Sequence, residues 1–399
     1  MRREDADQLN GFAVNKRLVP FALIMWLGFL SIGMPLPVLS IFVQDRLGFD
    51  ALVVGFVIGA QSFATLVSRQ LAGRMCDARG PKPTTFVGLG AASAAGVCYL
   101  AADRLFGAPT LALSILLIGR LLLGFGESLF ITSVAAWSIT RVGSANAGRA
   151  MAWSGISMYG ALAVGAPVGT YVAHIAGFQA VALCSVVAPL LGAVAAAVLR
   201  PLLTEKQARG SFLSVIGNIW IPGLCMALAS SGVGTISAFL ALYYDRLAWS
   251  GVGLALTAFG SAYILMRLLF GGLPDKIGGF TVALASLVTE AAGLLTIWLA
   301  PSPIVALIGT ALTGLGYSLV FPSMGVEALK SAGSLNRGLV LGAFFACFDL
   351  GVALAGPSAG LVAQTFGLNA VFPAAAILAL LACLLLLSRL STSNRGARN

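Results

Sequence analysis

Charged side chains are scarce in this sequence of 399 residues. Asp, Glu, Lys and Arg make up only 10% of it, whereas apolar side chains make up 59%. A soluble domain usually carries about a quarter charged residues, so a water-soluble fold of this size is excluded. Disorder is excluded by the apolar content, and a membrane β-barrel by the absence of strands that alternate apolar and polar residues. The composition indicates a helical protein that crosses the membrane many times.

Histidine and cysteine are also scarce. One histidine excludes most Ser/His/Asp sites and His-based metal sites, and the six cysteines form no CxxC pair. We interpret the cysteines as small packing residues and expect no disulfide and no metal. No phosphate-binding loop follows a strand, so ATP hydrolysis is not expected. The sequence therefore predicts neither an enzyme nor a cofactor.

Long apolar runs are what the sequence has in abundance. A helix needs about 20 apolar residues to cross roughly 30 Å of hydrocarbon. Twelve runs of that kind are present, and the division between the fifth and the sixth is the least distinct. They lie at 18–43, 51–72, 83–102, 110–134, 147–173, 178–199, 218–244, 251–271, 280–300, 303–326, 338–364 and 369–389.

The basic residues favour one orientation of these spans. With the N-terminus inside, 20 of the 24 Lys and Arg residues fall in cytoplasmic segments and three on the opposite side, while Arg120 lies within a span. This asymmetry predicts that both termini are cytoplasmic. It also explains the net charge of +10 without nucleic acid, because the charge is spread over seven short segments that face anionic lipid.

The chain contains an internal repeat. Asp45-Arg46-Leu47-Gly48 recurs as Asp245-Arg246-Leu247, and the glycines and acid of 73–80 recur in 271–278, at offsets of 200 and 198. A run at 165–169 has a counterpart at 356–360. We predict two six-helix bundles, residues 1–200 and 218–399, joined by a cytoplasmic linker at 201–217. Two such halves around a midplane cavity are typical of secondary transporters.

Four motifs carry a family resemblance. GRMCDARGPK at 73–82 resembles the loop between helices 2 and 3 of the major facilitator superfamily, and GGLPDKIG at 271–278 resembles its second copy. RLLLGFG at 120–126 resembles the superfamily's helix 4 motif. GALAVGAPVG at 160–169 resembles its helix 5 antiporter motif, with Ala166 where glycine is usual. The wording of FATLVSRQLAGRMCDARGPK and GYSLVFPSMGV is also similar to the YhhS-like group of bacterial efflux permeases.

The motifs supply the candidate gating residues. Gly73 would let helices approach, and Gly80 would turn the chain. The resemblance implies that Asp77 latches the two halves in the outward-facing state, and that the bend at Pro167 helps to close the path in exchangers; a topology signal and a plain structural kink are the alternatives. The full set is Gly73, Asp77, Gly80, Lys82, Asp275, Gly165 and Pro167.

Charges within the spans are the candidate proton-coupling groups, because a charge at the midplane costs at least about 2.5–3.5 kcal/mol. Arg120 and Glu127 share a face of the fourth span, and Asp349 lies in the eleventh. The resemblance implies that both spans line the cavity and that Arg120 takes part in proton handling. For Glu290 we expect a structural hydrogen bond, and for Glu327 a solvated surface pair with Lys330.

Amphipathic and aromatic residues on six spans are the candidate substrate contacts. Each alone is more often a packing residue, but together they suggest a partly apolar, uncharged or cationic substrate. The set is Trp26, Gln61, Tyr159, Tyr263, Tyr317, Phe321 and Phe348.

The function these observations favour is proton-coupled efflux of a small molecule by alternating access. We expect a monomer in the bacterial inner membrane that contacts lipid, protons and a small-molecule substrate. A symporter or facilitator that imports a metabolite is the alternative within transport, and a transporter-like receptor is the alternative outside it. A channel is a weaker alternative, since nothing resembles a selectivity filter.

Overall fold

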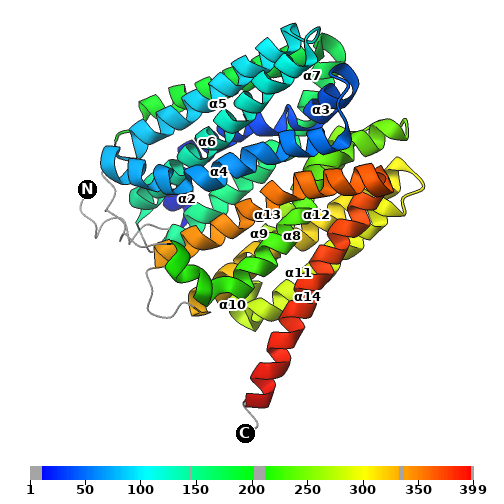
Figure 1. The fold of residues 1–399 in the computed structure, drawn as a ribbon. Helices are drawn as coiled ribbons and strands as arrows, with labels where there is room; N and C mark the ends of the chain where they lie inside the picture. The colour runs from blue at the N-terminus through cyan, green and yellow to red at the C-terminus, as the bar shows by residue number, and fades with distance from the viewer. Residues whose placement is uncertain (1–10, 144–145, 202–211, 332–336, 397–399) are drawn as a thin grey trace. The chain divides into compact units, whose positions relative to one another are not determined.

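The chain is helical wherever the structure describes it. The computed structural model describes residues 11–143, 146–201, 212–331 and 337–396, and these contain helices and turns but no strand (Figure 1). Helices satisfy their backbone groups within one segment, which lipid demands because it supplies no water. The first-half elements are α2 (Gly11–Gly33), α3 (Leu36–Ile41), η1 (Phe42–Arg46), α4 (Ala51–Arg79), α5 (Pro81–Arg104), α6 (Pro109–Val142) and α7 (Ala147–Val198). The second-half elements are α8 (Phe212–Arg246), α9 (Val252–Phe270), α10 (Leu273–Ile277), α11 (Gly279–Trp298), α12 (Pro303–Ser331), α13 (Arg337–Phe366), η3 (Leu368–Ala370) and α14 (Val371–Gly396).

Eleven helical segments of the described residues are long and apolar enough to cross a membrane, and one of them is two spans. The segment α7 runs for 52 residues, which at 1.5 Å per residue is about 78 Å, more than twice the hydrocarbon thickness. Gly177 breaks it with a left-handed φ of 78°. The sequence prediction of twelve spans, with the fifth ending before residue 178, agrees with this break.

The internal repeat is visible in the backbone. Gly80 and Gly278, offset by 198, both have positive φ (85° and 96°) and both precede the first residue of the next helix. At the other turn Gly48 has φ 75°, and Ala248, 200 residues later, has φ 52°. Ala248 is the one non-glycine with positive φ among the described residues. The second copy of this turn therefore keeps the left-handed backbone conformation although it has alanine in place of glycine.

The chain divides into two compact units. Unit 1 comprises Met1–Phe42 and Phe63–Gln207, and unit 2 comprises Val43–Ser62 and Ala208–Asn399. In unit 1, α5 packs on α6 and α7, and α2 packs on α7 and α6. In unit 2, α12 packs on α11, α9 and α8, while α8 also packs on α13 and α14. The predicted bundles at 1–200 and 218–399 stay a prediction; most of the predicted linker, residues 202–211, lies outside the described residues.

Candidate functional site

A hydroxyl group of α4 binds Glu127 of α6. Thr65 Oγ1 lies 3.2 Å from Glu127 Oε2 and 3.1 Å from the carbonyl oxygen of Gly124. A hydroxyl carries one proton but can also accept, so Thr65 donates to one of these acceptors at a time. Thr65 is buried, whereas Glu127 is only half-buried. The structure therefore brings a carboxyl group into contact with a hydroxyl that can reorient.

Arg120 lies two turns before Glu127 and is buried, with 1% of its surface exposed. Seven residues of helix separate the two along α6 by about 10 Å. The ring of Tyr99 in α5 packs against the turn that carries Arg120, because a Cβ added at Gly119 would lie 3.0 Å from it. The Tyr99 hydroxyl interacts electrostatically with Arg120. Arg120 therefore lies at the α5–α6 contact.

The sequence analysis missed two polar residues of α5. Tyr99 is fully buried, and Asp103, one turn further along, is 7% exposed. Asp103 Oδ1 has no hydrogen-bond partner among the described residues. The signal was an aromatic hydroxyl and an acid at i and i+4 within or next to an apolar run, which places them on one face of the helix.

Asp349 is buried in unit 2, with 3% of its surface exposed. It lies where α13 crosses α8 closely. Ser230 Oγ donates to the carbonyl oxygen of Phe348 at 3.2 Å, and a Cβ added at Gly351 would meet the carbonyl oxygen of Ala227. The backbone on both sides of Asp349 is thus positioned by α8.

Glu290 is the most enclosed acid of unit 2, with no exposed surface. Neither of its carboxyl oxygens has a hydrogen-bond partner among the described residues. A Cβ added at Gly232 of α8 would lie 2.6 Å from Glu290 Oε1, and Cys383 of α14 lies near enough to interact with it electrostatically. The prediction of a structural hydrogen bond at Glu290 is therefore wrong. The carboxyl group instead lies in the space beside Gly232, which has no side chain.

Lys82 anchors the end of a helix. Its Nζ atom donates to the carbonyl oxygens of Ala197 and Leu199, both at 2.7 Å. These carbonyl groups lie at the C-terminal end of α7, where the last four have no partner within the helix and a cation is favoured. A candidate gating residue thus ties α5 to α7 inside unit 1.

The other loop residues predicted to act in gating are less constrained. Asp77 is half-buried and Asp275 is exposed. A Cβ added at Gly73 would meet no heavy atom within 4 Å. The expectation that Gly73 permits a close helix approach is therefore wrong for this structure. Gly80 does turn the chain, as expected, because its φ of 85° is left-handed.

The helix 5 motif packs on an interruption of the first span. That span stops being regular at Met34 and Pro35, between α2 and α3. Cβ atoms added at Gly165 or Gly169 of α7 would meet the backbone of Met34. Gly165 is buried and Pro167 is half-buried. The glycines therefore permit contact between α7 and the broken first span.

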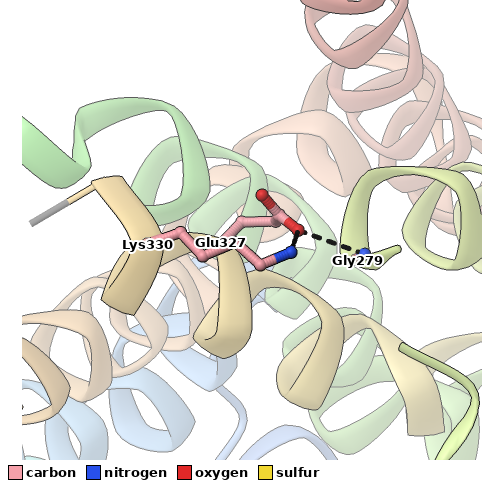
Figure 2. A network of polar contacts seen from close by, with 3 residues as sticks. All are labelled: Gly279, Glu327 and Lys330. Carbon is pink, nitrogen blue, oxygen red and sulfur yellow. Dashed lines mark hydrogen bonds and ion pairs between the residues drawn. The ribbon is translucent and has the colours of Figure 1, made fainter. Parts of the chain in front are cut away.

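Glu327 corrects a further expectation. It forms the predicted ion pair with Lys330, at 2.8 Å, but only 9% of its side chain is exposed against 59% for Lys330. The same Oε1 atom accepts a hydrogen bond from the Gly279 N–H at 3.1 Å, as Figure 2 shows. An acid at the first N–H groups of a helix is favoured by the helix dipole. Glu327 thus fixes the start of α11 rather than forming a solvated surface pair.

The candidate substrate residues are unequally accessible. Tyr263 and Tyr317 are buried, with ring centroids 6.1 Å apart, and Arg267 donates to the Tyr263 hydroxyl at 2.5 Å. Phe321 packs on two aromatic rings of α13. Gln61 is buried as well, whereas Trp26, Tyr159 and Phe348 are half-buried. Their contact with substrate stays a prediction.

Two units of apolar helices with buried acids and an arginine define a membrane transport protein rather than a soluble binding module. The Major Facilitator Superfamily model matches residues 21–252 and 223–399. An MFS-type transporter of Burkholderia mallei is 42% identical over 388 residues, which cover 95% of this chain and 94% of that one. The MFS-type transporter YhhS of Escherichia coli is 40% identical over 380 residues, covering 94% and 93%.

Two solved structures share the fold. The human organic anion transporter MFSD10 has a TM-score of 0.71 at 17% identity, covering 94% of this chain and 99% of that one. A mutant of the nucleoside transporter NupG has a TM-score of 0.73 at 15% identity, covering 93% and 99%. The chain belongs to the major facilitator superfamily, and it is a multi-pass membrane protein built as a secondary transporter.

Proposed function

We propose that this transporter exports a small molecule in exchange for protons, and that Glu127 carries the coupling proton. The observation that carries the proposal is the pair of acceptors around Thr65. When Glu127 is ionised, the Thr65 hydroxyl donates to it. When Glu127 is protonated, its own O–H donates to Thr65, whose proton then turns to the carbonyl oxygen of Gly124, 3.1 Å away. Both charge states are therefore satisfied without moving a helix.

The half-burial of Glu127 supports the same role. A coupling group must meet water during the cycle, and a fully enclosed acid such as Glu290 has no exposed surface through which to do so. Arg120 on the same helix biases the charge of Glu127 over about 10 Å. We assign Asp349 of unit 2 to substrate contact or to a reserve proton site.

Two substitutions test the proton assignment in everted vesicles. Glu127→Gln removes the ionisable oxygen and mimics the protonated state, so substrate should still exchange across the membrane but should not accumulate against a gradient. Its binding should also lose pH dependence. Thr65→Val deletes the reorienting hydroxyl and should slow proton-driven transport, whereas Thr65→Ser, which keeps it, should restore the rate.

Asp349→Asn provides the comparison from the other unit. If Asp349 contacts substrate, this change should raise the substrate concentration needed for half-maximal transport while leaving accumulation driven by protons. Full accumulation by Glu127→Gln together with its loss in Asp349→Asn would place the proton on Asp349 instead. Full accumulation in both variants would mean that neither carboxyl group carries the coupling proton. Transport that only equilibrates the substrate, in the parent as in both variants, would favour the facilitator.

The direction of transport rests on the resemblance of residues 160–169 to the antiporter motif and on the 40% identity to YhhS over most of the chain. Import by proton symport is the competing function. Substrate uptake into everted vesicles that rises when the vesicle lumen is made acidic supports export, because protons then leave the lumen as substrate enters it. Uptake by whole cells that collapses when the gradient is removed would support import instead.

We further propose that the protein lies in the bacterial cytoplasmic membrane as a monomer with both termini inside. The bias of basic residues supports this orientation. A reporter that is active only outside the cytoplasm, fused after Asn399, should be silent. Activity from that fusion would contradict the even number of spans and the orientation together.

A further inference from the structure

One end of unit 2 carries a cavity whose lining includes none of the candidate gating, proton-coupling or substrate residues. Its volume is about 460 Å³, and three elements besides α8 contribute to it: α11, α12 and α14. The lining residues are Asn218, Trp220, Ile221, Pro222, Phe280, Ser331 and Arg389. Such a volume lies within the usual range for small-ligand sites, about 300–1,000 Å³.

The charge of the cavity has one sign. Among the described residues that line it, Arg389 is the one with a charge, and Asn218 and Ser331 add an amide and a hydroxyl group. The nearby acid Glu327 is buried and paired with Lys330, the residue before Ser331, so its charge is already neutralised. The described lining therefore offers a guanidinium group, an amide and a hydroxyl group, all of which can donate hydrogen bonds to an anion.

Trp220 holds the guanidinium in place. The Arg389 Cζ atom lies 5.7 Å from the centroid of the Trp220 ring, within the range of a cation–π contact. A guanidinium group is a planar fork of donors whose geometry matches two oxygens of a phosphate group. Trp and Arg together are also the residues that anchor spans at the level of lipid headgroups.

Apolar surface continues from the cavity toward the middle of the spans. On α8, Ile216, Trp220 and Leu224 lie on one face and are each 41–46% exposed. On α14, Leu380, Leu384 and Leu387 are likewise 40–61% exposed. Arg389 is the last residue of the candidate span Leu368–Arg389, so the charge lies at the span's end and the apolar faces lie within it. A phospholipid has the same order, with a charged headgroup followed by hydrocarbon chains.

We propose that this cavity binds the phosphate-bearing headgroup of an anionic phospholipid, with its acyl chains along the exposed faces of α8 and α14. In the orientation favoured by the basic residues, this lipid belongs to the cytoplasmic leaflet. The site requires only that the chain spans a membrane, so it stands apart from the proton assignment.

A second cavity offers a matched control. It has a volume of about 390 Å³ and is lined by Val97, Leu100, Ala101, Arg104 and Leu105. Arg104 also ends a candidate span, but this cavity contains no aromatic ring and no other polar side chain. The second cavity therefore has an arginine, as the first one does, but lacks the tryptophan, amide and hydroxyl groups that accompany Arg389.

The test measures the thermal midpoint of the purified full chain in a neutral detergent. Phosphatidylglycerol should raise the midpoint saturably, because a ligand that binds only the folded state stabilises it. Arg389→Gln should shift the titration to at least tenfold higher lipid, and Arg104→Gln should not shift it. Brominated phosphatidylglycerol should quench part of the tryptophan fluorescence, and that part should be missing in Trp220→Phe.

Four results would overturn the assignment. An unchanged titration in Arg389→Gln, or an equal loss in Arg104→Gln, would reduce the effect to general surface charge. Equal protection by phosphatidylcholine would remove the role of the anionic headgroup. Equal protection by inorganic phosphate at matched concentration would make the cavity a site for a free anion rather than a lipid.

Discussion

Removal of the Lys82 charge separates two roles for the loop at 73–82. The resemblance places Lys82 among the gating residues, whereas the structure shows it bound to the last carbonyl groups of α7. We predict that Lys82→Met, which keeps the apolar stem and deletes the ammonium, lowers stability and leaves transport per folded molecule unchanged.

The magnitude follows from the two hydrogen bonds, each 2.7 Å long. A charged donor contributes about 1.5–3 kcal/mol per bond when buried, and less here because Lys82 is partly exposed. The favourable position at a helix C-terminus adds about 0.3–1 kcal/mol, and the ordering of a lysine side chain removes about 1.5–2 kcal/mol. The net loss should be about 1–2 kcal/mol, which corresponds to about 2–8 °C for a unit of roughly 200 residues.

The assay pairs thermal unfolding in detergent with transport in proteoliposomes, normalised to folded protein. Lys276→Met is the control, because Lys276 is an exposed lysine of the loop in the second copy of the repeat. It should leave the midpoint within about 1 °C of the parent, as surface changes usually do. A normal midpoint with lost transport in Lys82→Met would refute the anchoring role and restore the gating role.

Five further substitutions test three other features of the structure by the same unfolding measurement. Ala248 has a left-handed backbone conformation, so Ala248→Gly should stabilise the protein by about 0.5–1 kcal/mol. The reverse change at the matching turn, Gly48→Ala, should destabilise it. Changes in stability of the same sign and size in both variants would refute backbone strain at Ala248. Glu327→Gln should cost about 1–2 kcal/mol through Gly279, and more than Lys330→Met, whose side chain is mostly exposed. Glu290→Met should be neutral or stabilising by up to about 1 kcal/mol. The change replaces a buried carboxyl group without hydrogen bonds by a thioether of similar size. A large loss of stability in this variant would mean that the Glu290 carboxyl group has a partner.

The membrane spans could be predicted because each of about 20 successive residues adds to the same hydropathy signal. Apolar length, glycine at the turns and the repeat at 198 residues gave twelve helices, and even the break near Gly177 follows from one glycine between two runs. The interruption at Pro35 was visible as a proline but not as a break, because prolines also occur inside intact helices of this chain, such as Pro167 and Pro357.

The side-chain contacts could not be predicted, because each depends on the rotation of one helix against another. Thr65 is 62 residues from Glu127, and no spacing rule connects them. Lys82 was predicted to act in gating, and its contact with the end of α7 follows only from the packing of α5 on α7. Glu327 forms the predicted i,i+3 pair with Lys330, but it is buried rather than solvated, because it lies against the start of α11.

The repeat is preserved at its turns but not at the two charges within α6, and this difference bears on how the protein works. A left-handed turn is imposed by backbone geometry, so Gly80 and Gly278 persist and even Ala248 keeps the conformation of Gly48. Charged positions have no such constraint. The positions 198 residues after Arg120 and Glu127 are Ser318 and Gly325, and neither can carry a charge. At this offset the two charges of α6 therefore have no duplicate in α12, where the nearest acid, Glu327, is paired with Lys330. Because the two halves differ at these positions, neutralising Glu127 should uncouple transport, and any compensation should come from Asp349 on α13.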